Sequence, residues 1–185
     1  GVAAQHSRFC LRAATVEVAE GRLGPRLSIW LIAFSAAVLS VQLLVSGGYL
    51  DVSESRQLAT TGSMSGAIIG GLMFGAGMIL ARGCASRLLV LSATGNLRAI
   101  ITGLVLTLVA QSALRGALAP ARESLAALWT VPGGAARSLL IQLGATSGLV
   151  AVFAAVALAG ALIHAHRNAV KTSHAIAAIG VGIAV

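Results

Sequence analysis

Two cysteines are the residues of this sequence with the most distinctive chemistry. Cys84 follows Gly83, directly after a glycine-rich apolar stretch, and Ser86 comes two residues later. The missing side chain of Gly83 leaves space beside the sulfur, and a short helix is expected from Ser86. A helix N-terminus offers N–H groups and partial positive charge to an anion. A thiol adds a weak hydrogen-bond donor, and weak binding allows the solute to be released again. The segment therefore predicts a contact point for a small anion.

Cys10 lies in similar surroundings, because Arg8 precedes it as Arg82 precedes Cys84. Each arginine either attracts an anion or fixes its segment at the membrane interface. The alternative interpretation is that each cysteine has no role in anion contact and simply packs as a small, buried apolar residue. The spacing alone favours this interpretation. The cysteines show no Cys-x-x-Cys or Cys/His zinc spacing, so neither a metal nor another cofactor is predicted, and a disulfide between them is open but without support.

Other polar residues carry weaker signals. Asn96 either lines a solute path or caps the helix expected from about residue 99, and capping is the simpler interpretation. No Ser-His-Asp order, phosphate-binding loop or paired intramembrane carboxylate is present, so an enzyme is not predicted and proton coupling through buried acids is disfavoured. We expect three histidines to lie in a solvated, basic connector: His164, His166 and His174.

The composition restricts the class of protein. Hydrophobic residues make up 57% of the chain and charged residues 10%, against roughly 25% charged in an ordinary soluble domain. The net charge of +8 comes from single Lys and Arg residues between apolar blocks, which favours basic loops beside lipid over nucleic-acid binding. We therefore expect an all-α, polytopic integral membrane protein.

The apolar runs set the number of membrane helices, since each crossing needs about 20 residues. Spans are predicted at about 28–50, 57–81, 99–114 and 138–164, with a partial span at 175–185. The third run is short unless Arg98 and Arg115 extend to the interfaces. The chain starts without Met and stops inside an apolar run, so residues 1–185 are expected to form a single membrane domain cut from a longer polypeptide.

An internal repeat links the two cysteine segments. Five residues of the first unit recur in the second at one constant offset: Gly1, Arg8, Cys10, Gly21 and Leu23 match Gly75, Arg82, Cys84, Gly95 and Leu97. The units cover about 1–50 and about 75–115. Both segments are too apolar for loops and too charged for spans, so short re-entrant segments are expected, as in transporters with interrupted helices. The distribution of Lys and Arg places them toward the cytoplasm.

The stretch from Gly70 to Arg87, which leads through glycine-rich sequence into Gly83-Cys84, resembles the YeeE/YedE family of sulfur-transport membrane proteins. The sequence around Cys10 is similar to that family's upstream cysteine motif. The resemblance implies thiosulfate uptake through the cell inner (plasma) membrane, with re-entrant segments meeting at a constriction where thiols relay the anion. The predicted substrate pathway comprises Cys84, Cys10, Gly83, Arg82, Ser86, Arg8 and Asn96.

The leading hypothesis is thus a transporter or channel for a small sulfur-containing anion, most simply thiosulfate. A membrane thiol-disulfide oxidoreductase that cycles Cys10 with Cys84 is an alternative from another class, although the adjacent cysteine pair of such enzymes is missing. Selenium-related transport and a non-transporting membrane subunit are further alternatives. Expected partners are the anion, the lipid bilayer and, as a candidate, a cytoplasmic sulfur-carrier protein; the oligomeric state is open.

Overall fold

Helices form nearly all of the regular structure in the part of the chain that the structure describes. The computed structural model describes residues 1–185 except 51–59, 134–143, 145 and 185. The chain divides into two compact units, one made of Gly1–Val52 with Leu140–Val185 and the other of Ser53–Leu139. Each unit is described by itself below.

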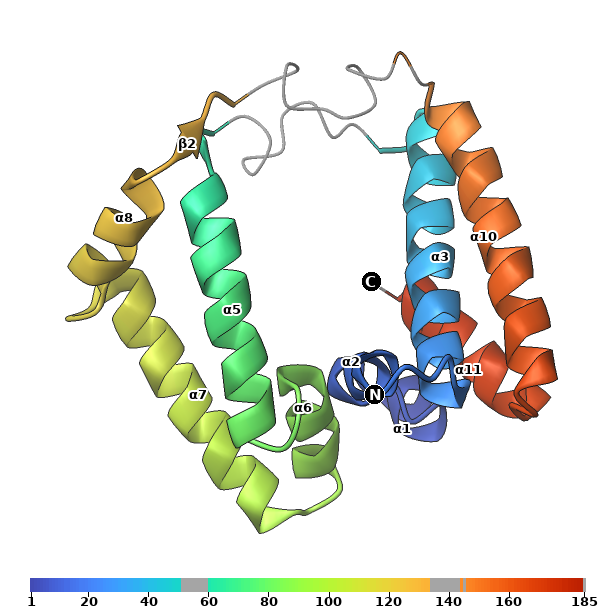
Figure 1. The fold of residues 1–185 in the computed structure, drawn as a ribbon, viewed down its shortest axis with the longest axis horizontal. Coiled ribbons are helices and arrows are strands. Elements are labelled where there is room, and N and C mark those ends of the chain that lie inside the picture. Colours follow the sequence, from blue (N-terminus) through green and yellow to red (C-terminus); the bar gives the residue numbers. More distant parts are fainter. Residues whose placement is uncertain (51–59, 134–143, 145, 185) are drawn as a thin grey trace. The chain divides into compact units, whose positions relative to one another are not determined.

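The described residues of the first unit form α1 (Val2–His6), α2 (Leu11–Ala19), α3 (Pro25–Ser46), α10 (Ser147–Arg167) and α11 (Thr172–Ile183). Helices α3 and α10 lie side by side along most of their length, and α11 packs against α3 (Figure 1). Small side chains dominate the core, which consists of Ile29, Ile32, Ala33, Ala161, Ala165, Ala175 and Ala178. Alanine lets helix backbones approach closely, as is typical of packed membrane helices.

Gly182 marks the closest approach between α11 and α3. A Cβ atom added there would lie 2.8 Å from the Cβ atom of Ala36 and would also collide with the carbonyl oxygen of Ala33. Since a carbonyl oxygen in the middle of a helix cannot move independently of its helix, only glycine fits at this point.

Helix α3 begins three residues before the predicted start because a distant carboxylate caps it. Pro25 is the first helical residue, a position where the missing N–H costs nothing. The Glu17 carboxylate accepts hydrogen bonds from the backbone N–H groups of Leu27 (2.9 Å) and Arg26 (3.3 Å). Helix α2 thereby supplies the cap of the following long helix.

Replacing Glu17 with Ala is expected to lower the free energy of unfolding by about 1 kcal/mol, the usual value of a helix N-cap. Glu20→Ala is the matched control, because Glu20 pairs only with Arg22 at the surface and exposed ion pairs contribute little. Thermal unfolding in detergent, followed by helical circular dichroism, measures both. Equal losses in the two variants would contradict a capping role for Glu17.

The second unit contains α5 (Met64–Leu80), α6 (Ala85–Ala93), α7 (Leu97–Arg115) and α8 (Ala119–Ala127). A short strand, β1 (Gly62–Ser63), pairs antiparallel with β2 (Thr130–Val131). The side chain of Ser63 donates to the carbonyl oxygen of Ala126 (2.6 Å), and that of Ser65 donates to the carbonyl oxygen of Leu125 (2.7 Å). These bonds join the start of α5 to the end of α8.

The β pairing explains one difference from the sequence-based expectation. Helix α5 begins at Met64 instead of residue 57, because Ser63 lies in the strand and caps the helix through the N–H of Gly66. Helix α8 ends at Ala127, and the chain after Trp129 enters β2. Part of the predicted span 57–81 and the start of the span 138–164 lie outside the described residues.

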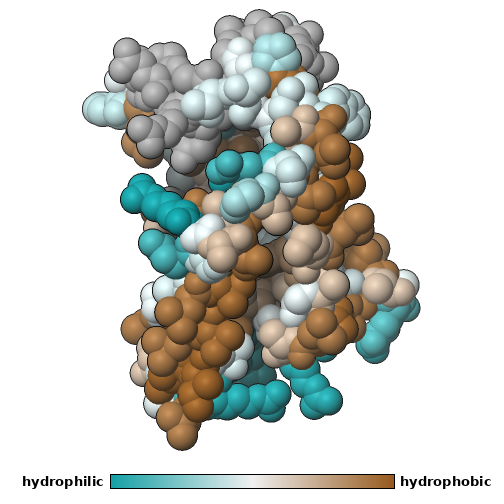
Figure 2. All heavy atoms as spheres, turned by 90° about the vertical axis from the view of Figure 1, so that its left-hand side faces the viewer, coloured by the Kyte–Doolittle hydropathy of each residue, from teal (hydrophilic) through white to brown (hydrophobic). Residues whose placement is uncertain are grey.

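Three helices among the described residues, α3, α7 and α10, are long and apolar enough to cross a membrane. Helices α5 and α6 together make a fourth candidate, bent by 42° at the break between them, and α11 is a shorter apolar helix. Large apolar side chains are exposed along these helices, for example Leu72 (72%) and Leu108 (71%). Figure 2 shows broad hydrophobic areas on the side where α7 and α8 lie. The prediction of an all-α, multi-pass membrane protein is confirmed, since such surfaces require lipid or protein cover.

The glycine-rich face of α5 has no neighbour in the described part of the chain. A Cβ atom added at Gly70, Gly71 or Gly75 would meet no atom within 4 Å. Small residues let helix backbones approach closely, and we predict that another helix packs on this face.

Candidate functional site

The break between α5 and α6 is made by an arginine in the left-handed backbone region. Arg82 has φ +54°, and the N–H of Gly83 bonds to the carbonyl oxygen of Met78 while that of Arg82 bonds to Ile79 (both 3.2 Å). This is the Schellman arrangement, which usually has glycine at the left-handed position. A side chain there costs roughly 1 kcal/mol or more, so arginine at this position lowers stability relative to glycine.

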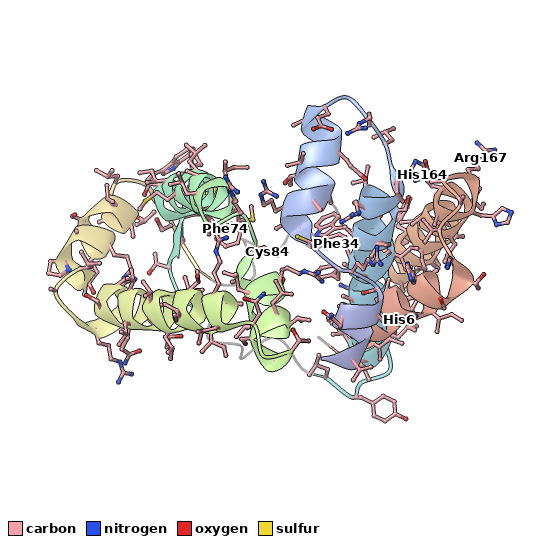
Figure 3. The ribbon with its side chains drawn as sticks, turned by 90° about the horizontal axis from the view of Figure 1, so that it is seen from below. His6, Phe34, Phe74, Cys84, His164 and Arg167 are labelled. Atoms are coloured by element: carbon pink, nitrogen blue, oxygen red, sulfur yellow. The ribbon has the colours of Figure 1, made fainter. Side chains whose placement is uncertain are left out.

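Cys84 lies directly after this break and begins the next helix. It occupies the N-cap position of α6 and is 2% exposed. Its sulfur lies 3.2 Å from the hydroxyl oxygen of Ser86, where either group can donate. Figure 3 labels Cys84 at this junction. Gly83 is also buried, and a Cβ atom added to it would touch the side chain of Leu88 at 3.7 Å, so the helix itself closes part of the space expected beside the sulfur.

The segment around Cys10 has the same local backbone plan. Arg8 also has φ +54°, and the N–H groups of Phe9 and Arg8 close α1 on the carbonyl oxygens of Ala4 and Gln5 (both 3.3 Å). Cys10 occupies the N-cap position of a helix of 9 residues, and Cys84 does likewise. Cys10 is half-buried, and Arg8 is exposed.

Each nine-residue helix is followed by a left-handed glycine and then by a long helix. Gly21 (φ +71°) follows α2, and Gly95 (φ +83°) follows α6. The long helices are capped differently, however. Glu17 caps α3, whereas Asn96 caps α7 by accepting from the N–H of Ala99 (3.2 Å). The capping interpretation of Asn96 is confirmed, and its role in a solute path stays a prediction.

The structure adds two arginines that the sequence-based selection missed. Arg12 on α2 and Arg87 on α6 each place one guanidinium nitrogen, Nε and Nη1 respectively, in a buried position without a hydrogen-bond partner among the described residues. Both follow the cysteine of their segment, by two and three residues. A buried polar nitrogen without a hydrogen-bond partner is costly, and an anion would supply such a partner. Because an arginine follows each cysteine at a similar distance, the sequence alone could have identified both arginines as candidates.

His164 corrects one expectation from the sequence. Instead of lying in a solvated connector, it is half-buried where α10 packs on α3, and its Nδ1 atom lies 2.8 Å from the hydroxyl oxygen of the buried Ser28. Figure 3 labels its position. His166 is exposed, as expected. Within the described ranges, no three His, Cys, Asp or Glu side chains lie close enough to hold a metal ion.

A protein-family model described as sulphur transport matches residues 6–182. The chain belongs to the sulphur transport family. The match includes both cysteine segments and all the long helices. No curated protein and no solved structure matches the chain. A member of this family with several apolar helices is a multi-pass membrane protein that acts in sulfur transport, with the lipid bilayer around it and a sulfur-containing anion as its substrate.

Proposed function

We propose that this sulphur transport protein belongs to the YeeE/YedE group and carries thiosulfate, or a closely similar sulfur oxyanion, across the cell inner membrane. The observation that carries the proposal is the environment of Cys84. There a buried thiol lies beside the Ser86 hydroxyl at a helix start, and the same helix carries the Arg87 guanidinium nitrogen that has no hydrogen-bond partner among the described residues.

These groups have complementary roles toward a sulfur oxyanion. The Arg87 cation and the partial positive charge at the start of α6 attract negative charge. The thiol and hydroxyl donate weak hydrogen bonds that orient the anion, and the soft sulfur suits the terminal sulfur of thiosulfate. Weak donors favour passage over capture, because a transport site must also release its solute.

The matching segment around Cys10 supports a second contact of the same kind. It repeats the left-handed arginine, the N-cap cysteine, the nine-residue helix and the buried arginine nitrogen. We therefore propose two copies of one structural unit, about 1–50 and about 75–115, each presenting one thiol to the anion. The basic ends of these segments favour the cytoplasmic side, where we propose that a sulfur-carrier protein receives the anion.

Uptake by proteoliposomes tests the proposal. Vesicles with the purified protein are expected to accumulate ³⁵S-labelled thiosulfate above protein-free vesicles, and unlabelled thiosulfate is expected to compete better than sulfate or phosphate. Cells that depend on this protein for thiosulfate give the same measurement in its native membrane. Accumulation no faster than in protein-free vesicles, together with growth unaffected by loss of the protein, would contradict the proposal.

A further inference from the structure

A pocket in the first unit gathers positive charge, and of its lining residues only Arg8 belongs to the predicted substrate pathway. It has a volume of about 270 Å³ and lies between the start of α3 and the turn from α10 to α11. Its polar lining comes from Arg8, Arg26, Asn168, Lys171 and His174, and its apolar lining includes Ile29 and Val170. None of its lining residues is acidic. The volume corresponds to roughly nine water molecules at about 30 Å³ each, enough for a partly hydrated ion.

Three of the lining side chains carry a permanent positive charge, and two of them stand where helix electrostatics disfavour cations. Arg26 is in the first turn of α3, and Lys171 is the N-cap residue of α11. Helix N-termini favour negative charge by about 0.3–1 kcal/mol per group. The N–H groups of α3 are already bound by Glu17, so the side chains and the start of α11 remain to attract a ligand.

Backbone geometry holds the basic groups in position around the pocket. The backbone of Arg8 forms a left-handed turn, and Ala169, also left-handed at φ +53°, forms the tight turn before Lys171. The side chain of Asn168 donates to the carbonyl oxygen of His164 at 2.9 Å, which closes the end of α10. The pocket is therefore built by ordered turns from three separate parts of the chain.

We propose that this pocket binds a tetrahedral oxyanion, either as a free sulfur or phosphorus oxyanion or as the phosphate of an anionic phospholipid. Arginine side chains suit such groups because their N–H donors match two oxygens at once. The apolar rim beside Ile29 and Val170 accommodates the glycerol end of a lipid when the phosphate belongs to one. Cys84 is not among the lining residues of this pocket, and the proposal does not depend on the proposed transport of thiosulfate.

Direct binding to the purified full chain tests the proposal. In one arm, protein in nanodiscs of neutral phosphatidylcholine is dialysed against labelled thiosulfate, sulfate or inorganic phosphate. In the other, native mass spectrometry counts the phosphatidylglycerol molecules retained from mixed vesicles. Arg26→Gln with Lys171→Gln is the test variant. Arg22→Gln with Arg167→Gln is the control, since it removes the same charge from exposed positions outside the pocket.

In one of the two arms, we expect the test variant to lose binding at least tenfold, which corresponds to about 1.4 kcal/mol. The control variant should change binding less than about twofold. Loss in the dialysis arm identifies a free ion, and loss in the lipid arm identifies a headgroup. Absence of binding in both arms, or equal losses in the test and control variants, would overturn the proposal. Helical circular dichroism confirms that each variant is folded.

The pH dependence provides a second readout. Burial lowers the pKa of His174, as do the nearby positive charges of His6, Arg8 and Lys171, and Arg26 adds a further cation from α3. His6 contacts the His174 ring edge-on at 5.2 Å between centroids. A bound anion offsets this repulsion, so binding should draw a proton onto His174 and tighten as the pH falls from about 7.5 to about 5.5. His174→Gln is expected to weaken this dependence; an unchanged profile would remove His174 from the site.

Discussion

Replacing Cys84 with Ala is expected to reduce thiosulfate uptake by roughly 10- to 100-fold. The expected size follows from the loss of one hydrogen bond to a charged solute, which contributes about 1.5–3 kcal/mol. The thiol is 2% exposed and lies beside Ser86. Water therefore has little access to the position of the sulfur and should not readily replace its hydrogen bond to the anion. Cys84→Ser retains a donor of smaller size and lower polarizability, and its uptake should fall between the wild-type and Ala values.

Ser92→Ala is the control for this experiment, because Ser92 lies on the same helix and its hydroxyl donates only to the carbonyl oxygen of Leu89 at an exposed position. Initial rates of ³⁵S-thiosulfate uptake, normalised to the amount of protein in the membrane, give the comparison. A Cys84→Ala protein that is present in normal amount and transports at the wild-type rate would show that the thiol has no part in transport. Cys10→Ala, measured in parallel, tests whether the second segment contributes a thiol of equal importance.

Replacing Gly182 with Ala is expected to lower the free energy of unfolding by about 1–3 kcal/mol, the usual cost of overpacking. The added methyl group would lie 2.8 Å from the Cβ atom of Ala36 and against the backbone of α3. The effect should exceed the gain of up to about 1 kcal/mol that Ala brings over Gly within a helix. Because α11 also carries Lys171 and His174, its displacement should weaken oxyanion binding in the basic pocket.

Gly180→Ala is a matched control for this change. It lies on the same helix, and its added methyl group would meet only the Cβ atom of Ala3 at an ordinary 3.8 Å. Thermal unfolding in detergent should therefore show Gly180→Ala at or above the wild-type midpoint and Gly182→Ala clearly below it. Equal midpoints for the two variants would mean that α11 can shift away from α3 without cost.

The local features of this protein could be predicted from the sequence because they depend on neighbouring residues. Apolar runs of sufficient length identified the membrane helices, even though several ends differ by a few residues. Asn96 before an apolar run indicated a helix cap, and the structure has this cap. The glycine-rich approach to Cys84 pointed to sulfur transport, the family to which the chain belongs.

Only the tertiary structure decided the contacts between distant segments, because they depend on how the helices pack and in which register. Glu17 caps a helix that begins eight residues later, His164 bonds to Ser28 from another helix, and Ser65 anchors the end of α8. The basic pocket likewise joins Arg8, Arg26 and Lys171, which no sequence spacing relates. Hydropathy determined that these helices enter a membrane, whereas side-chain size and hydrogen bonding at each crossing determined which polar groups meet.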